Sequence, residues 1–145
     1  MRVFVTGAAG FIGSGVVPDL IAAGHTVTGL ARSDANVETL KRMGADVLRG
    51  SLEDIDSLKR GSAEADGVIH LAFIHDFAKF AENGQIDKRA IEAMGETLIG
   101  TNKPLVVTSG VGLLAPGRLS TEEDVARISE SIPRVSENAV LPFAT

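Results

Sequence analysis

Residues 6–13 read Thr-Gly-Ala-Ala-Gly-Phe-Ile-Gly, a TGxxGxxG pattern that decides the fold of this chain. The pattern follows a β-branched and aromatic run at 3–5 and precedes a segment with helical spacing, the context that gives such a motif its meaning. Gly7 permits a tight turn, Gly10 lets the backbone approach a pyrophosphate, and Gly13 lets the helix pack closely on the sheet. The loop therefore predicts a dinucleotide phosphate site; the alternative is a glycine-rich turn without a ligand.

Short apolar strands alternate with helical patterns along the rest of the chain. We expect strands at 3–5, 26–31, 46–48, 67–72 and 104–109. We expect helices at 10–23, 37–43, 52–60, 86–98 and 121–131, and no clear pattern from 132 onward. This alternation predicts a parallel sheet with helices on both faces, and right-handed crossovers give the strand order 3-2-1-4-5. The expected fold is an α/β, doubly wound, Rossmann-type domain over 1–145.

Composition excludes several classes of function. The 145 residues suffice for one domain but not for two full ones. A net charge of −5 argues against a nucleic-acid or anionic-membrane surface, because both need a basic face. No apolar run approaches the roughly 18 residues that span a bilayer, and Met1 leads directly into a strand pattern without a signal peptide. We therefore expect a cytoplasmic protein. The absence of cysteine excludes disulfides and thiolate chemistry.

Four segments together carry a family resemblance. They are TGAAGFIG at 6–13, GADVLRGSLED at 44–54, GVIHLAF at 67–73 and PLVVTSG at 104–110. In this order they resemble the extended short-chain dehydrogenase/reductase family, also called the NAD-dependent epimerase/dehydratase family. The resemblance implies an NAD or NADP site in an N-terminal Rossmann part and a substrate site in a smaller C-terminal part. Complete members are longer, so it also implies that the substrate part is largely absent here.

The resemblance extends the predicted cofactor site beyond the loop. Ser51 and Leu52 stand where the family usually has Asp-Leu beside the adenine, so the aspartate is missing. Leu71 and Ala72 match a pair beside the nicotinamide ribose. These positions lie at carboxyl ends of strands, where an open α/β sheet binds ligands. The whole predicted set is Gly7, Ala9, Gly10, Phe11, Ile12, Gly13, Arg32, Ser33, Ser51, Leu52, Leu71, Ala72, Phe73 and Thr108.

The end of the second strand favours NADP over NAD. An NAD-selecting acid usually ends this strand, about 20 residues after the first glycine. Counting from Gly7, that place is near Ala31, which has no carboxylate to repel a 2′-phosphate. Arg32 and Ser33 follow, and they offer a cation and a hydroxyl to that phosphate. Asp34 is a counter-signal, and we expect it to lie past the ribose.

The family's catalytic residues are not all present. The resemblance implies a YxxxK motif that supplies the proton-transferring tyrosine, and this chain contains no tyrosine. Either Pro133 replaces the tyrosine and Glu137 the lysine, or the motif lies beyond Thr145. Ser109 matches a hydroxyl that binds the reacting oxygen of the substrate. Its alternatives are a serine that caps a strand end, or an alignment in which Gly110 takes that position.

The three histidines have no metal-ligand spacing, so we expect no metal site. We expect His70 to be a core residue bonded to the backbone. His75 and Asp76 either touch substrate or are ordinary polar residues of a surface loop. A hydrolase triad of Ser109, His75 and Asp76 is disfavoured, because an adjacent His and Asp cannot easily serve as base and orienting group.

Two functions therefore stand open. One is the NADP-binding part of an oxidoreductase, epimerase or dehydratase acting on a small carbonyl or sugar-like substrate; the other is an NADP-binding redox sensor or regulatory protein without catalysis. The missing tyrosine favours the sensor, and the size of the enzyme class favours the enzyme. The resemblance also implies a homodimer, in which the helices at 86–98 and 121–131 pair across a two-fold axis. No nucleic-acid or membrane partner is expected.

Overall fold

The computed structural model describes residues 1–114, 117–125 and 134–144. The strands are β1 (Arg2–Thr6), β2 (Thr26–Ala31), β3 (Asp46–Arg49), β4 (Gly67–His70) and β5 (Leu105–Val107). The helices are α1 (Gly13–Ala22), α2 (Asp34–Arg42), α3 (Ile55–Glu64), α4 (Phe80–Leu98) and α5 (Ser136–Val140). Short 3-10 turns occupy η1 (Phe77–Lys79), η2 (Val111–Leu113) and η3 (Leu141–Phe143).

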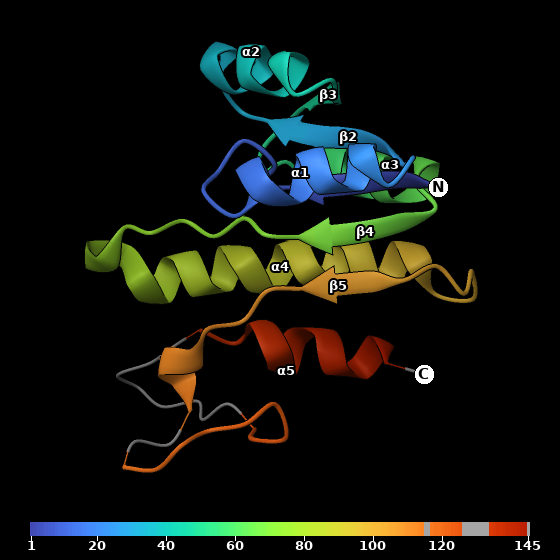
Figure 1. Ribbon diagram of the computed structural model, residues 1–145. Coiled ribbons are helices and arrows are strands. Elements are labelled where there is room, and N and C mark those ends of the chain that lie inside the picture. Colours follow the sequence, from blue (N-terminus) through green and yellow to red (C-terminus); the bar gives the residue numbers. More distant parts are fainter. Residues whose placement is uncertain (115–116, 126–133, 145) are drawn as a thin grey trace.

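The five strands form one parallel sheet in the predicted order β3-β2-β1-β4-β5 (Figure 1). In the central strand, Val3 is aligned with Val27 of β2 and with Gly67 of β4. The chain leaves β1 toward β2 and returns across the sheet to β4. The strand order reverses at this point, which is where an open α/β sheet binds its ligand.

Alternation along β1 builds a separate core on each face of the sheet. Val3 and Val5 pack with α1 and α2, whereas Phe4 packs with α3 and α4. Phe4 and Val5 have no exposed surface. Truncating a buried Phe typically costs about 3–5 kcal/mol. These two cores fix the carboxyl ends of β1 and β4 relative to each other.

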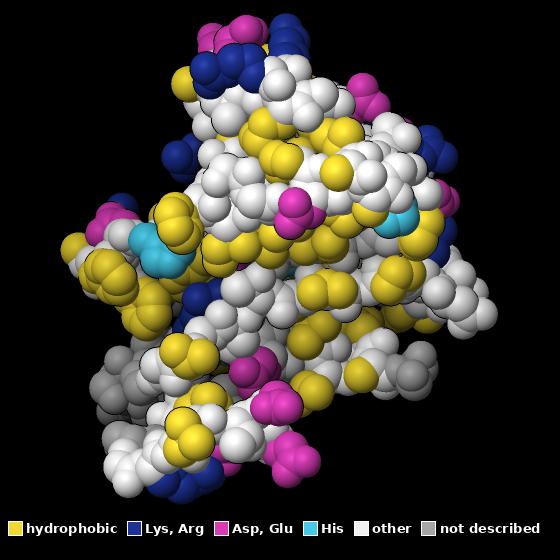
Figure 2. Space-filling model, viewed as in Figure 1, with side chains coloured by type: hydrophobic (Ala, Val, Ile, Leu, Met, Phe, Trp, Pro, Cys, Tyr) yellow, Lys and Arg dark blue, Asp and Glu magenta, His cyan; other side chains and the backbone are white. Residues whose placement is uncertain are grey.

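Helix α4 packs against other helices as well as against the sheet. It lies beside α3, and α5 packs along it near β5 (Figure 1). Gly95 leaves room for the Phe143 ring, because a Cβ there would come within 2.5 Å of that ring. On the opposite face, Ile69 of β4 packs against the core cluster that includes Val17 of α1, and no helix of the described chain lies over β5 (Figure 1). Hydrophobic side chains gather over these strands (Figure 2), and Val106 is 55% exposed.

Most differences from the predicted elements are at their ends. Strand β4 ends at His70 and β5 at Val107, each two residues before the predicted end. Helix α1 begins at Gly13, because residues 10–12 form the loop. Helix α4 begins at Phe80 rather than at 86, since the η1 turn leads directly into it.

The predicted helix at 121–131 is wrong where the structure describes it. Residues 121–125 are a turn, and 126–131 lie outside the described residues. The Asp124 carboxylate accepts hydrogen bonds from the Thr121 N–H at 2.8 Å and from the Arg118 guanidinium. The Thr121 N–H is therefore a donor to Asp124, which closes the turn.

Candidate functional site

The glycine loop between β1 and α1 has the geometry expected from its sequence. Gly7 has a φ of +68°, which favours glycine. A Cβ at Gly7 would lie 2.7 Å from the Ala72 nitrogen, so the two loops meet backbone to backbone. A Cβ at Gly13 would overlap the carbonyl oxygens of Gly7 and Ala8. Gly7 and Gly13 therefore serve close backbone packing.

The start of α1 presents unpaired backbone donors. The Gly10 N–H donates to the Gly7 carbonyl at 2.9 Å and closes the turn. In contrast, the N–H groups of Phe11, Ile12 and Gly13 have no acceptor within the described residues. The first turn of α1 carries no acidic residue. Free N–H groups and the helix dipole attract anions at such a terminus, so this loop can hold phosphate groups.

A cavity of about 680 Å³ opens at the carboxyl edge of the sheet, beside this loop. Eleven of the predicted cofactor residues line it: Gly7, Ala9, Gly10, Phe11, Ile12, Arg32, Ser51, Leu52, Leu71, Ala72 and Phe73. It is bounded by loops that follow β1, β2, β3 and β4. A volume of this size suits a small-molecule ligand or cofactor.

Three other predicted residues do not line this cavity. Gly13 lies behind the loop, where it permits the close packing of α1. The Ser33 hydroxyl accepts a hydrogen bond from the Asn36 N–H at 3.3 Å and caps α2. Thr108 is bound through its backbone, because its N–H donates to the His70 carbonyl and its own carbonyl accepts from Arg134.

Six lining residues were not in the predicted cofactor set: Leu30, Asn36, Gly50, Glu53, Ile74 and His75. Most adjoin predicted positions at strand ends, so widening each predicted segment by one or two residues would have found them. Asn36 is different, because it reaches the cavity from the first turn of α2. His75 had been identified as a possible substrate contact, and its place in the lining is consistent with that role.

The charges near the end of β2 are divided between the cavity and the surface. Arg32 lines the cavity, and Ala31 is fully buried. Asp34 is not among the lining residues. Its carboxylate pairs with Arg49, and this hydrogen bond lowers the pKa of Asp34. Glu53 supplies the acidic side chain of the lining.

Ser109 lies two residues beyond the end of β5 and does not line the cavity. Its hydroxyl oxygen is buried and has no hydrogen-bond partner within the described residues. Such a buried hydroxyl is uncommon and marks a position to examine by mutation. Of the second predicted catalytic region, Pro133 falls outside the described residues, and Glu137 lies in α5.

Aromatic rings form a cluster at the β4 end of the cavity. The Phe73 ring packs edge to face with His75 and with Phe80, at centroid distances of 5.2 and 5.7 Å. Phe77 packs against Phe80 and is 76% exposed. The Arg134 guanidinium lies on the Phe73 ring, 4.2 Å from its centroid. Partial burial lowers the pKa of Arg134, and the charge of Asp87 opposes this shift.

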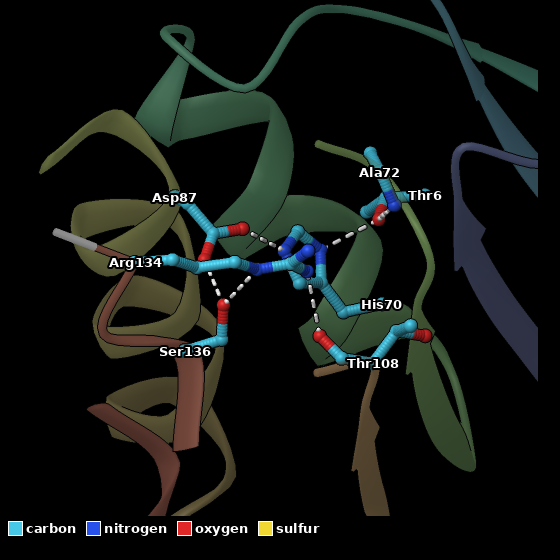
Figure 3. Close-up of polar contacts among 7 residues, drawn as sticks. All are labelled: Thr6, His70, Ala72, Asp87, Thr108, Arg134 and Ser136. Carbon is cyan, nitrogen blue, oxygen red and sulfur yellow. Dashed lines mark hydrogen bonds and ion pairs between the residues drawn. The ribbon is translucent and has the colours of Figure 1, made fainter. Parts of the chain in front are cut away.

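A chain of polar side chains lies beneath this end of the cavity (Figure 3). It runs from Thr6 through His70 and Asp87 to Ser136 and Arg134. His70 is buried, as predicted, but its ring bonds to side chains instead of the backbone. The reason is that α4 places a carboxylate opposite the ring, which strand periodicity alone does not indicate.

Within the part of the chain that the structure describes, no group of three or more His, Cys, Asp or Glu side chains could hold a metal ion. No helix there is both long and apolar enough to cross a bilayer.

Comparison with known proteins identifies the family. The model of the NAD-dependent epimerase/dehydratase family matches residues 3–121. The chain belongs to this family. Members of the NAD-dependent epimerase/dehydratase family use a nicotinamide dinucleotide, which agrees with the glycine loop and the cavity beside it.

Several relatives of this family member align over most of its length. An uncharacterised protein of Schizosaccharomyces pombe is 49% identical over 148 residues, covering 100% of this chain and 50% of the relative. Dihydroflavonol 4-reductase of Hordeum vulgare is 34% identical over 123 residues, covering 76% of this chain and 35% of the enzyme. The chain spans about half the length of the curated relatives it matches from end to end.

Solved structures agree on the fold. UDP-glucose 4-epimerase of Thermotoga maritima has a TM-score of 0.75 at 24% identity and covers 96% of this chain and 48% of that one. Vestitone reductase of alfalfa has a TM-score of 0.74 at 19% identity, and the match covers 98% of this chain and 52% of the reductase. At these identities the likeness extends to the fold alone.

Proposed function

We propose that this chain is the NADP-binding part of an oxidoreductase that acts on a small carbonyl or sugar-like substrate. The observation that carries the proposal is the composition of the cavity. The TGxxGxxG loop forms one wall, and its N–H groups at residues 11–13 have no acceptor within the described residues. Arg32 lines the cavity just after β2, and the last residue of that strand, Ala31, has no carboxylate. Asp34, the counter-signal, is paired with Arg49 and does not line the cavity.

The lining residues fit a dinucleotide. The loop from Gly7 to Gly13 would hold the pyrophosphate, and Arg32 would face the 2′-phosphate of the adenosine. Ser51 and Leu52 would lie beside the adenine, with Leu71, Ala72 and Phe73 toward the nicotinamide. Ser33 and Thr108 make no contact with the cavity in this structure, so we give them weaker roles. When bound, the cofactor supplies hydride transfer at the nicotinamide ring.

The type of substrate is inferred from relatives. Their names include a dihydroflavonol 4-reductase and a 2-alkyl-3-oxoalkanoate reductase, and both describe reductions. These names favour an enzyme over the alternative of a redox sensor. Ser109, whose buried hydroxyl has no partner among the described residues, is the candidate for binding the reacting oxygen. His75, which lines the cavity, is the second candidate for a substrate contact.

We also propose that the intact protein is a homodimer. This proposal rests on the family resemblance. The two helices expected to pair give it no support, because residues 121–125 are not helical and α5 packs along α4. Light scattering at tens of micromolar would measure the mass, and a monomer at that concentration would contradict the proposal.

The cofactor proposal is tested by calorimetry of the 145-residue chain with NADP and with NAD. We expect NADP to bind more tightly. Equal or tighter binding of NAD would overturn the NADP preference, and no binding of either would overturn the function itself.

A further inference from the structure

The carboxylate of Asp87 is the acceptor at which two hydrogen-bonded arms meet (Figure 3). Asp87 lies on α4 and is 1% exposed. Its Oδ1 is 3.0 Å from Nε2 of His70, and its Oδ2 accepts from the Ser136 hydroxyl at 2.6 Å. Nothing in the proposed cofactor contacts uses this carboxylate. A buried carboxylate is costly without partners. The groups that its two arms reach therefore indicate its role.

The first arm leads to the cavity. His70 Nδ1 lies 2.6 Å from the Thr6 hydroxyl oxygen, and that oxygen is 3.4 Å from the Ala72 N–H. Thr6 directly precedes Gly7, and both Gly7 and Ala72 line the cavity. The Thr6 hydroxyl therefore joins the glycine loop to the loop that follows β4, at the point where their backbones touch.

For a neutral His70 ring, counting donors and acceptors along this arm leads to one tautomer. The Asp87 carboxylate only accepts, so His70 donates from Nε2. In a neutral ring Nδ1 then accepts, and the Thr6 hydroxyl donates its proton to it. The Thr6 oxygen is thereby turned to accept from the Ala72 N–H. This arrangement gives every buried polar atom of the arm a partner, as folded proteins require.

The second arm leads to Phe73, the residue after Ala72 in the same loop. Arg134 Nε donates to the Ser136 oxygen at 2.9 Å, and Arg134 Nη2 donates to the Thr108 carbonyl at 2.9 Å. The same guanidinium covers the Phe73 ring, which lines the cavity. The buried charge of Asp87 is thus balanced through Ser136 by a cation that packs on a wall of the cavity.

We infer that Asp87 is a positioning residue for two of the loops that bound the cavity, the glycine loop after β1 and the loop after β4. Its carboxylate sets the tautomer of His70, and this tautomer directs the Thr6 hydroxyl so that its oxygen holds the Ala72 N–H. The effect of Asp87 on cofactor binding rests on the proposed function of the cavity. Its effect on the His70 tautomer does not depend on that function.

Replacing Asp87 by asparagine separates this role from packing, because the two side chains have nearly the same shape. The asparagine amide can donate to His70 Nε2, which moves the ring proton to Nδ1. Nδ1 then donates to the Thr6 oxygen, so the Thr6 hydroxyl loses the acceptor that had fixed its rotation, and its oxygen is no longer held toward the Ala72 N–H. The matched control is Ser136→Ala, which removes the other partner of Asp87 and leaves the His70 arm intact.

The first measurement is the ¹⁵N NMR spectrum of the His70 ring in the 145-residue chain without cofactor. We expect the proton on Nε2 in the parent and in Ser136→Ala, and on Nδ1 in Asp87→Asn. We also expect faster amide exchange of Ala72 in Asp87→Asn alone. A parent ring protonated on Nδ1 would overturn the inference, and this result needs no variant to fold.

The second measurement is NADP affinity by calorimetry. Asp87→Asn should weaken binding by about tenfold, the effect of losing one hydrogen bond at the site, and Ser136→Ala should weaken it less. Unchanged affinity in Asp87→Asn, with the tautomer moved, would overturn the positioning role. If the parent chain binds no dinucleotide, the proposed function fails, and the ring spectra still decide whether Asp87 sets the contact between the loops.

Discussion

The Arg134 guanidinium lies 4.2 Å from the centre of the Phe73 ring and donates a hydrogen bond to the Thr108 carbonyl. Arg134 and Phe73 are far apart in the sequence. The contacts of Arg134 with Phe73 and Thr108 tie the segment before α5 to the carboxyl ends of β4 and β5. A cation on an aromatic face is worth about 0.5–2 kcal/mol, depending on how far it is removed from water.

Arg134→Ala should therefore destabilise the fold by about 1–3 kcal/mol, through loss of the ring contact and of two hydrogen bonds. Urea unfolding measures this change. The control is Arg118→Ala, which removes an exposed pair with Asp124 and should cost about 1 kcal/mol or less. An equal loss of unfolding free energy in the two variants would show that the contacts of Arg134 stabilise the fold no more than an exposed ion pair does.

Gly10→Val should abolish tight dinucleotide binding. Gly10 lines the cavity, and a branched side chain there would stand where the pyrophosphate is proposed to lie. Calorimetry should show at least a tenfold loss, about 1.4 kcal/mol. The control is Gly15→Val, because a Cβ at Gly15 on α1 meets no atom within 4 Å. Binding by Gly10→Val as tight as by the parent chain would mean that this loop is not the phosphate site.

Arg32→Ala should weaken NADP and leave NAD nearly unchanged. A hydrogen bond to a charged group contributes about 1.5–3 kcal/mol, which corresponds to roughly 10- to 150-fold in affinity. Arg42→Ala is the control, since Arg42 lies on α2 and bonds to Thr39 outside the cavity. A parallel loss for both cofactors would assign Arg32 to a contact that NAD and NADP share.

The 145-residue chain should bind NADP but not turn over a substrate at a rate near one per second. Proton transfer by a positioned group contributes about 10²- to 10⁴-fold, and this chain has no tyrosine to provide it. Ser109 alone would remain a weak, protonated hydroxyl. NADPH oxidation with ketones, aldehydes and nucleotide sugars measures this. Turnover near that rate would refute the prediction, and His75 would then be the first residue to mutate.

The stability of the fold should depend on Asp66 above about pH 4. The Asp66 carboxylate accepts a hydrogen bond from the Arg2 N–H at 2.6 Å, which lowers the pKa of Asp66 in the folded state. A lowered folded pKa stabilises the fold above the unfolded pKa, and this contribution is lost as the pH falls through the folded value. Asp66→Asn should therefore lower the urea midpoint at pH 7 and matter little at pH 2. A deficit of equal size at both pH values would exclude this linkage.

The sheet and the glycine loop could be predicted because their signals are local. Glycine spacing, strand character and helix periodicity are each read within about 15 residues, and together they gave the strand order and most of the cavity lining. Ser33 shows where a local signal has two meanings. Its place after Arg32 predicts a phosphate contact, and a serine before a helix is also a common N-cap. The structure shows the cap, and the phosphate contact stays a prediction.

The polar chain beneath the cavity could not be predicted, because its contacts join distant parts of the sequence. Thr6 and His70 are 64 positions apart, and Asp87 and Ser136 are 49 apart. Strand periodicity made His70 a buried residue, but only the packing of α4 brings a carboxylate to its ring. Likewise, the position of Arg134 on Phe73 depends on the path of the chain after β5.

The strand order also protects the sheet against strand addition by other chains. Parallel order 3-2-1-4-5 leaves β3 and β5 as the two edges, whose unpaired backbone groups could template aggregation. Strand β5 has only three residues and is preceded by Pro104, which has no N–H to offer. Strand β3 carries Asp46 and Arg49 at its ends, and charged side chains discourage pairing at an edge. Among the described residues, the short length of β5 and the charges of β3 therefore both oppose pairing with a strand of a neighbouring molecule.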